Sequence, residues 1–580
     1  MGQMRRFRGE GAARGIAIGP AYLLAAKVTV AERRILRQDR DAELAHLEDG
    51  IAATDQQLER LQRDLPDDGG PGHDLIEVHK MILRSQEMAG HSRRLIADEC
   101  FSAEWAVTRA MDPIRKVFLG LLNPTFRERG ADFEAVGERL LRVLLSLPEL
   151  RAGEATPAGS IAVGIDLSPL DPYRLKRAGV AGIVTDGGGP TSHTAIVARA
   201  LGLPCVLGVK QLSGWVRPGS VVILDGARGD VVLDPTDETL QAYRAGAVAE
   251  RQHEEQLSAE RDLPATTTDG VRIYLRANVE SLAGVAAAMS AGAEGIGLFR
   301  TEFLYLGRAD LPTEEEQYRD AVSVLEAVHG LPVTFRTIDL GADKLPVAIK
   351  LPEGPNPALG LRSIRFALER PDIFRTQLRA LYRAAAVGPM RLMFPLVSGV
   401  TELQQARAIC SEVRAQLTAE GIAHDPGLPI GIMLETPSAA LTADHLARDV
   451  DFFSIGTNDL IQFTFAADRD NVDVRHLRQP NHPAVLRLLK SMVDDAGEAH
   501  LPISICGDMA SDPLLTWLLL GLGLRDLSMD SHCIPVVKSI IRRSSLAEAV
   551  ALTAEALTLR SEGEVTSLGD HLRQRRQGHR

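Results

Sequence analysis

The sequence predicts a multidomain α/β protein whose C-terminal half folds as a (β/α)₈, or TIM, barrel. After residue 268, eight short apolar segments alternate with helical patterns over about 300 residues, as expected for such a barrel. An open doubly wound sheet is the alternative. The barrel is favoured because nearly every segment ends in a polar residue, and barrel sites are built from the carboxyl ends of strands. The segments are VRIYLRANV, GIGLFRTE, VTFRTID, RLMFPLV, IGIMLET, DFFSIGTND, ISICGD and DLSMD.

The N-terminal half begins with a short β pattern and continues with helices. RGIAIGPAYLL at residues 14–24 predicts a short strand pair with a glycine turn. From Leu44 to Leu65, apolar residues recur at alternating steps of three and four with one interruption, at Thr54. This spacing predicts a helix with one apolar stripe, packed in a bundle rather than in a free coiled coil. Further helices are expected around residues 74–97, 102–119 and 126–147.

Four segments are expected along the chain. Short β runs at residues 151–235, with a helix after His193, predict a compact α/β domain into which the helical block is inserted. The charged, alanine-bearing stretch that follows predicts a linker helix. The expected segments are an α/β domain of residues 1–25 and 148–235, an inserted helical bundle of residues 26–147, a linker helix of residues 236–265, and the barrel of residues 266–580.

The composition limits the class of protein. The 580 residues are 45% hydrophobic and 24% charged, as in ordinary globular proteins, and the net charge of −12 disfavours nucleic acid as a main partner. Five scattered cysteines without a CxxC pair argue against a disulfide framework or a structural zinc site. No run of 18 uncharged apolar residues and no signal-peptide pattern occur. We therefore expect a cytoplasmic protein with no membrane insertion.

Residues 186–194, DGGGPTSHT, place a histidine inside a candidate anion site. Glycines let the backbone approach an anion, and the free N–H groups and dipole of the following helix N-terminus favour negative charge. Thr191, Ser192 and Thr194 add hydroxyl donors, and Arg199 adds a positive charge one to two turns later. A phosphoryl group on the ring of His193 would be well held there. The alternative is that the hydroxyl residues only cap the helix and that the histidine is an ordinary polar residue.

A second candidate site is spread over the strand ends, which carry Asn278, Arg300, Arg336, Glu435, Asn458, Asp459 and Cys506. Arg300 and Arg336 end two strands, and Arg469 follows TNDLIQFTFAADR. Guanidinium groups that converge on one mouth suit a small, highly charged anion. Glu435 and Asp459 end neighbouring strands, as a Mg²⁺ site requires, because Mg²⁺ takes one or two carboxylates and completes its shell with phosphate oxygens and water. The alternative is an arginine–carboxylate network that only stiffens the barrel rim.

Cys506 ends the seventh strand segment, in SICGDMASD. A thiol with an ordinary pKa of about 8.5 is mostly protonated at neutral pH and can donate that proton. A buried structural cysteine is the default interpretation of a single cysteine, so the rest of the site is what favours a role in proton transfer.

Together these motifs resemble enzyme I of the bacterial phosphotransferase system, a phosphoenolpyruvate–protein phosphotransferase of the phosphoenolpyruvate (PEP)-utilising enzyme family. The resemblance runs nearly end to end, and its strings are highly specific in this order and spacing. They are RGIAIGPA, GGGPTSHTAIVAR, GLFRTEFLY, RTIDLGADK, NPALGLRSIR, MLETPSAA, DFFSIGTNDLIQFTFAADR and ICGDMASD.

The resemblance implies a role for each candidate residue. His193 would carry the phosphoryl group, and Cys506 would protonate the enolate carbon to release pyruvate. The residues implied to bind PEP are Arg300, Arg336, Arg362, Asn458, Asp459 and Arg469; those implied to hold Mg²⁺ are Glu435 and Asp459. Thr191, Ser192 and Arg199 would support the phosphohistidine. The α/β domain would swivel, the helical block would dock the phosphocarrier protein HPr, and the barrel would form a homodimer.

The implied reaction moves a phosphoryl group from PEP through His193 to a histidine of HPr, as the first step of sugar uptake. Position 190 is Pro where many relatives carry Arg, VHKMILRSQE lacks an expected acidic residue near position 85, and Ala342 and Asp508 replace glycine and glutamate. A pyruvate dikinase or PEP synthase would need an ATP-binding domain, for which no stretch here offers the length. A Mg²⁺-dependent barrel lyase would leave the histidine idle, and a non-catalytic phospho-relay regulator would not need the intact site. The choice between the sugar-uptake and nitrogen-type branches stays open.

Overall fold

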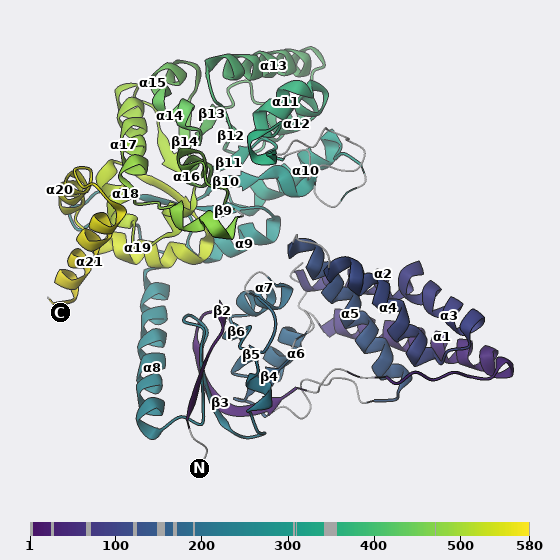
Figure 1. Cartoon of the computed structure of the whole chain (residues 1–580). Coiled ribbons are helices and arrows are strands. Elements are labelled where there is room, and N and C mark those ends of the chain that lie inside the picture. Colours follow the sequence, from purple (N-terminus) through teal and green to yellow (C-terminus); the bar gives the residue numbers. More distant parts are fainter. Residues whose placement is uncertain are drawn as a thin grey trace. The chain divides into compact units, whose positions relative to one another are not determined.

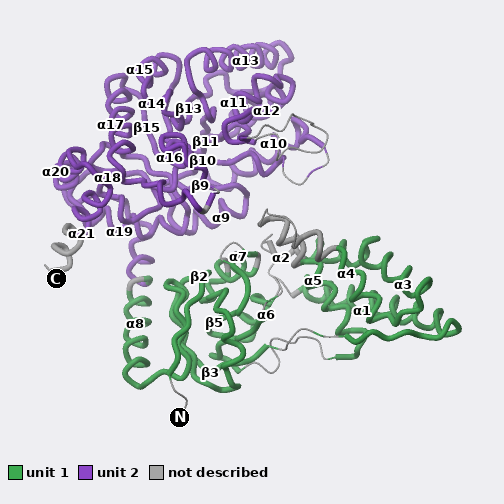
Figure 2. Tube along the Cα trace, viewed as in Figure 1, with its two compact units in different colours: residues 1–254 green, residues 255–580 purple. Residues whose placement is uncertain are grey.

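The protein divides into two compact units, residues 1–254 and 255–580 (Figures 1 and 2). The computed structural model describes residues 4–24, 28, 30–64, 71–119, 124–147, 157–165, 167, 171–189, 192–305, 308, 310–340, 356–469 and 471–578. The division falls inside helix α8 (Asp237–Glu260), within the segment expected to be a linker helix. The division into two units is coarser than the four predicted segments, so the limits of those segments remain predictions.

Five helices form the bundle in unit 1: α1 (Arg40–Asp64), α2 (Pro71–Arg84), α3 (His91–Glu99), α4 (Ala103–Leu119) and α5 (Pro124–Leu144). The stripe predicted on α1 is confirmed, since Leu47 and Leu58 are fully buried in the core of the bundle. Thr54 interrupts the stripe without an unmet polar group, because its hydroxyl donates to the carbonyl of Gly50 at 2.7 Å.

The single helix predicted over residues 74–97 is wrong, because the chain breaks at Ser85. Its hydroxyl accepts the N–H of Met88 at 3.1 Å and starts a π-helical turn, Gln86–Gly90, which leads into α3. A serine hydroxyl that binds nearby backbone competes with the hydrogen bonds that would continue a helix. The apolar periodicity carries no sign of this competition.

The α/β part of unit 1 is built on eight strands: β1 (Arg5–Arg8), β2 (Glu10–Ala13), β3 (Ile16–Leu23), β4 (Ile161–Gly164), β5 (Gly182–Thr185), β6 (Cys205–Leu207), β7 (Val221–Asp225) and β8 (Asp230–Leu233). Their order is β1-β8-β7-β3-β4-β5-β6-β2, with β3 to β6 parallel and the other pairs antiparallel. Only Gly9 separates β1 from β2, although the two strands lie at opposite ends of this order. The sheet therefore curls until its edges meet, where Gly9 donates to the carbonyl of Gly229 at 2.8 Å.

The strand pair predicted at residues 14–24 is also wrong, because β3 runs without a turn through Gly19 and Pro20. A Cβ on Gly19 would lie 2.1 Å from the carbonyl oxygen of Gly159. Glycine is needed here for the close approach of two backbones rather than for a turn. Helices α6 (Asp171–Arg177) and α7 (His193–Ala200) complete this part of the unit.

Unit 2 is a closed barrel of eight parallel strands, as predicted: β9 (Tyr274–Val279), β10 (Ile296–Arg300), β11 (Val333–Arg336), β12 (Met390–Phe394), β13 (Ile430–Leu434), β14 (Phe452–Ile455), β15 (Ile503–Ile505) and β16 (Asp526–Met529). Seven of them lie within a predicted apolar segment, and β12 begins one residue before its segment, RLMFPLV. The helices around it are α9 (Leu282–Ser290), α10 (Glu314–Ala327), α11 (Ser363–Glu369), α12 (Pro371–Ala385), α13 (Val400–Ala419), α14 (Pro437–Leu441), α15 (Ala443–Leu446), α16 (Thr457–Phe465), α17 (Pro483–Glu498), α18 (Thr516–Leu522), α19 (Ile534–Arg542), α20 (Leu546–Ala556) and α21 (Glu562–Gly578).

The end of α8 is tied to the barrel by backbone and ionic contacts. Lys538 donates to the carbonyl of Arg261, and Arg543 Nη2 lies 3.0 Å from Glu260 Oε1. These contacts give the expected linker helix a firm attachment on unit 2. None of the helices in the described ranges has the length and apolar content needed to span a bilayer.

Candidate active site

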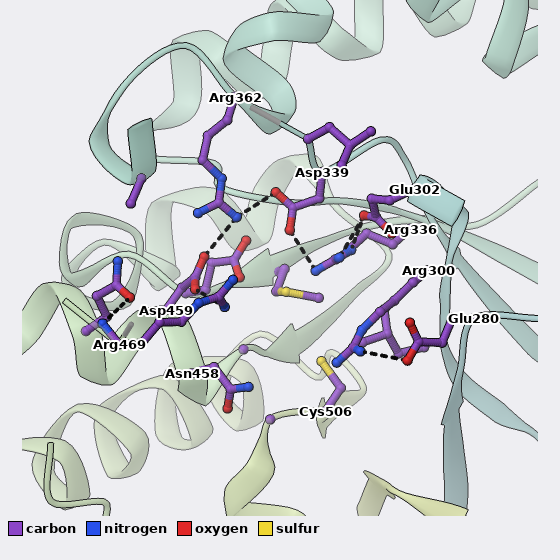
Figure 3. A pocket seen from close by; sticks show the side chains of 18 of the residues that line it. Glu280, Arg300, Glu302, Arg336, Asp339, Arg362, Asn458, Asp459, Arg469 and Cys506 are labelled. Atoms are coloured by element: carbon purple, nitrogen blue, oxygen red, sulfur yellow. Dashed lines mark hydrogen bonds and ion pairs between the residues drawn. The ribbon is translucent and has the colours of Figure 1, made fainter. Parts of the chain in front are cut away.

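A cavity of about 390 Å³ opens at the carboxyl end of the barrel (Figure 3). Arg300 and Arg336 are the last residues of β10 and β11, while Glu435 and Cys506 directly follow β13 and β15. Because all the strands are parallel, these positions meet at one end of the barrel. Apart from Asn278, the cavity is lined by the barrel residues predicted to belong to the site: Arg300, Arg336, Arg362, Glu435, Asn458, Asp459, Arg469 and Cys506.

Two carboxylates hold the guanidinium of Arg336. Its Nε and Nη2 donate to Glu302 Oε1 at 3.1 and 2.7 Å, and its Nη1 lies 3.0 Å from Asp339 Oδ2. Burial alone would lower the pKa of Arg336, but the nearby carboxylates, Asp339 first, raise it above its usual value. Burial alone would likewise raise the pKa of Asp339, but Arg336 and Arg362 hold it below its usual value. The cavity therefore contains a permanently charged, rigidly oriented guanidinium.

Arg362 reaches the same carboxylate from the start of α11. Its Nη2 lies 2.7 Å from Asp339 Oδ1 and 3.1 Å from Asp459 Oδ2 (Figure 3). The next residue, Ser363, is buried at φ 56° and donates its hydroxyl to Asp339. This left-handed conformation costs a non-glycine residue on the order of 1–3 kcal/mol and is kept only where its surroundings enforce it. Asp339 is thus the hub that orients two arginines.

Asn458 and Asp459 are not at a strand end as predicted. They lie in the first turn of α16, the helix that follows β14. Asp459 Oδ1 is 3.5 Å from Arg469 Nη1, and Asn458 Oδ1 accepts the backbone N–H of Asp508 at 2.9 Å. Since β13 and β14 are neighbours, Asp459 still comes close to Glu435.

Arg300 lies nearer the rim of the cavity than Arg336. Its Nη1 is 3.5 Å from Glu280 Oε1, and about a third of its side chain is exposed (34%). A partly solvated guanidinium with one distant partner can turn toward an incoming anion at little cost. Arg300 is therefore well placed to change partners when a ligand enters.

Glu435 is a buried carboxyl whose neighbouring arginines do not offset the effects of burial and of the nearby carboxylates on its pKa. Its side chain is 3% exposed, and the pKa is raised well above the usual value, first by burial and then by Asp459 and Asp339. Oε1 accepts the N–H of Leu396 at 2.5 Å, whereas Oε2 has no hydrogen-bond partner among the residues that the structure describes. A divalent cation beside Oε2 would relieve this excess of negative charge.

The residues around Glu435 fit a Mg²⁺ ion that is completed by a ligand. In the described ranges, no three His, Cys, Asp or Glu side chains are grouped as a metal cage. Mg²⁺ does not need such a cage, since it commonly takes one or two carboxylates together with phosphate oxygens and water. A Cβ at Gly456 would lie 2.8 Å from Glu435 Oε2, so glycine keeps the space beside that oxygen open.

We expect metal binding at this carboxylate pair to depend on pH. Because the pKa of Glu435 is raised, the carboxyl keeps its proton to higher pH than an ordinary glutamate, and a metal must displace that proton. Affinity for Mg²⁺ should rise as pH rises through the raised pKa, with release of up to one proton. Calorimetric titration of Mg²⁺ in buffers of different ionisation enthalpy measures both quantities. Glu435→Gln should abolish the pH dependence; equal affinity from pH 6 to 9 in the unaltered protein would contradict the assignment.

Cys506 presents a protonated thiol to the cavity. Its side chain is buried, Ser454 donates its hydroxyl to Sγ at 3.3 Å, and Sγ lies 3.6 Å from the carbonyl of Ile455. Burial raises the pKa of Cys506 to about 11, so the thiol carries its proton at neutral pH. Asn278, also predicted at a strand end, donates to the carbonyl of Cys506 at 2.9 Å and so holds this residue in place.

His193 is the first residue of α7, in unit 1. The preceding Ser192 accepts the N–H of Ala195 at 3.3 Å and caps the helix, as the alternative interpretation of the motif expected. Gly188, at φ +88°, provides the left-handed turn that leads from β5 toward the helix. The side chain of His193, together with Pro190 and Thr191, lies outside the described residues. The backbone supports the predicted helix N-terminus at the histidine, and the ring's environment stays a prediction.

Arg199 lies in the last turn of α7, at the end away from His193. Its Nε donates to the carbonyl of Ala12 on β2 at 3.1 Å. The two residues are about 9 Å apart along the helix axis, at ~1.5 Å per residue. Support of a phosphohistidine by Arg199 therefore remains a prediction. The hydrogen bond described for this side chain is to β2 of the sheet.

Glu302 and Asp339 are site residues that the sequence analysis missed. Both stand in quoted strings, FRTE and RTID, two and three residues after the arginines that end β10 and β11. The signal was a carboxylate following a strand-terminal arginine at short spacing. Spacing alone does not say which arginine a carboxylate binds: Asp339 binds the arginine of its own strand, whereas Glu302 follows β10 and binds the arginine of β11.

The carboxyl end of the barrel gathers arginines, carboxylates and a protonated thiol, which suit chemistry on a small polyanion. Comparisons with protein families give the class of enzyme. The models that match are "PEP-utilising enzyme, N-terminal" at residues 8–129, "PEP-utilising enzyme, mobile domain" at residues 156–229 and "PEP-utilising enzyme, PEP-binding domain" at residues 254–546. The protein is a PEP-utilising enzyme with a mobile domain and a barrel that binds PEP.

Curated relatives narrow the class to one family. A phosphoenolpyruvate-protein phosphotransferase of Cupriavidus necator is 42% identical over 89% of this chain and 90% of its own. Those of Geobacillus stearothermophilus and Bacillus subtilis are 39% and 37% identical over 97% of this chain and 97% and 99% of theirs. The chain belongs to the phosphoenolpyruvate-protein phosphotransferase family, as its resemblance to enzyme I predicted.

Proposed function

We propose that this protein transfers a phosphoryl group from PEP to His193 and then to a histidine of HPr, releasing pyruvate, as the first step of sugar uptake. The observation that carries the proposal is the cavity in which four arginines, two candidate metal ligands and a protonated thiol converge. The full-length similarity to phosphoenolpyruvate-protein phosphotransferases supports it. The cavity accounts for both halves of PEP, its phosphate and its enolate.

The arginines would bind the anionic groups of PEP. Arg336 and Arg362, held by Asp339, would offer fixed guanidinium forks, while Arg300 and Arg469 would close over the ligand from the rim. Asn458 would donate an amide hydrogen, and Asp459 would offer its carboxylate to the metal. Catalysis of this kind is mostly positioning and electrostatic stabilisation, which suits groups already held in place.

Mg²⁺ held by Glu435 and Asp459 would neutralise charge on the phosphoryl oxygens. Loss of the phosphoryl group would leave an enolate, and the thiol of Cys506 would deliver a proton to its carbon. A buried carboxyl with a raised pKa supports the metal assignment. A thiol that stays protonated at neutral pH supports the proton transfer.

The histidine and the cavity belong to different units, so the α/β domain would have to swivel. At the start of α7, free N–H groups and the helix dipole would stabilise a phosphoryl group on His193, with Thr191 and Ser192 beside it. Cross-linking the α/β domain to the barrel should stop transfer to the carrier and spare self-phosphorylation. Survival of both activities in the cross-linked protein would rule out the swivel.

The helical bundle would dock HPr. Val78 and Met81 on α2 are 41% and 72% exposed, and apolar side chains of this size on one helix favour a protein partner. Met81→Glu should weaken transfer to HPr and leave self-phosphorylation unchanged. Homodimerisation through the barrel and a cytoplasmic location stay predictions; light scattering of the full chain tests the first.

One incubation separates the proposed function from a lyase and from a non-catalytic regulator. With PEP labelled in its phosphate, Mg²⁺ and no ATP, we expect an acid-labile phosphohistidine and one pyruvate for each phosphoryl group transferred. A dikinase would need the nucleotide for its complete reaction, a lyase would consume substrate without labelling the protein, and a non-catalytic regulator would do neither. Absence of label without ATP would overturn the proposal.

A further inference from the structure

A second cavity, of about 240 Å³, lies at the other end of the barrel from the active site. Its lining consists of Arg391, Gly427, Pro429, Asp451, Phe452 and Pro502. Pro429, Asp451 and Pro502 directly precede β13, β14 and β15, and Arg391 is the second residue of β12. The active-site cavity follows the carboxyl ends of the strands, so this basal cavity opens at their amino ends.

The barrel interior separates the two cavities. Leu298, Met393, Met433, Phe452 and Cys506 form one buried apolar cluster across it. Arg391 precedes Met393 by two positions, so both side chains point to the same face of β12 and into the barrel. The basal cavity is therefore a separate site on the axis of the barrel, below its apolar core.

The guanidinium of Arg391 has donors to spare. Within the part of the chain that the structure describes, it has no ion pair or hydrogen bond, and its recorded contact is with the ring of Phe452, whose centroid lies 5.4 Å from Cζ. Burial first, and then the charge of Arg276, lower the pKa of Arg391. Arg276 itself is matched, with Nε 2.8 Å from Asp526 Oδ1. Arg391 is half-buried, and an arginine kept only to stabilise the barrel base would be expected to have such a partner, because a partly desolvated charge without one is costly.

The rest of the lining limits what can bind there. Asp451 Oδ2 already accepts the N–H of Ile430 at 2.8 Å, and its negative charge disfavours a ligand with two negative charges. Phe452 and the two prolines offer apolar surface for a short carbon chain. We propose that the basal cavity binds a small monocarboxylate, with its carboxylate on Arg391 and its carbon end against Phe452. This site does not depend on the proposed function.

The test is saturation-transfer NMR on the full-length protein, with propanoate as the observed ligand and inorganic phosphate, which has no protons to observe, as a competing anion. Arg391→Gln should weaken propanoate binding about tenfold or more, since it removes a charge-assisted hydrogen bond. Asp451→Asn keeps an oxygen for the N–H of Ile430 but removes the repulsion, so it should tighten propanoate binding and admit phosphate. Propanoate bound among the arginines of the upper cavity contributes equally to all three proteins.

Superimposable propanoate titrations of the unaltered protein and Arg391→Gln would overturn the proposal. Thermal unfolding of each variant shows whether the fold is kept. If Arg391→Gln does not fold, Asp451→Asn is decisive: tighter binding of propanoate supports the basal site, and unchanged binding overturns it.

Discussion

Replacing His193 by alanine is expected to abolish transfer of the phosphoryl group from PEP, both to the protein and to HPr. The imidazole is the proposed acceptor, and removal of a nucleophile that forms a covalent intermediate commonly costs about 10⁶-fold in rate. Labelled PEP with Mg²⁺ measures the loss, and mass spectrometry of the unaltered protein locates the phosphate.

The matched control is His445→Ala. This histidine is exposed on α15, outside the cavity lining, and should be replaceable without loss of transfer. Phosphate on another histidine of the unaltered protein, or label retained in His193→Ala, would refute the proposed acceptor. The experiment also tests whether the His193 ring, whose surroundings remain a prediction, accepts the phosphoryl group.

Replacing Cys506 by alanine is expected to slow pyruvate formation by about 10²–10⁴-fold, the usual contribution of a positioned general acid. The thiol carries its proton at neutral pH because burial raises its pKa to about 11. Exchange of the phosphoryl group between PEP and the protein should fall much less, since the proton is delivered to carbon after the phosphoryl group has left. A pyruvate assay coupled to lactate dehydrogenase, run beside isotope exchange, separates the two steps.

Cys410→Ala is the matched control for this change. Cys410 is similarly buried, on α13, and does not line the cavity. Turnover of Cys506→Ala equal to that of Cys410→Ala would remove Cys506 from the mechanism. A fall in exchange as deep as the fall in pyruvate formation would assign it a role in binding instead.

The sequence was sufficient for the barrel because two local signals agreed. Eight apolar segments marked the strands, and polar residues at their ends marked the face where parallel strands finish. Strand register then brought Arg300 and Arg336 side by side, as their positions implied. A barrel of this kind can be recognised from sequence because each strand–helix repeat has a similar length and the same pattern of apolar and polar residues.

Other features depended on contacts between segments far apart in the chain. Gly19 looked like a turn residue, yet it lies inside a strand because Gly159 approaches it closely. Ser85 divides a helix through one capping bond that periodicity does not register. Glycine and serine each serve several backbone roles, and the surrounding fold selects among them.

The chemistry of the site divides in the same way. Residue types and spacing were enough to indicate arginines, carboxylates and a thiol at one end of a barrel, because these residues follow the apolar strand segments directly in the sequence. Which carboxylate holds which arginine, and why the pKa of Glu435 is raised, follow from three-dimensional neighbours. Charge pairing and burial are properties of distances in space, and these exist only once the strands have closed into a barrel.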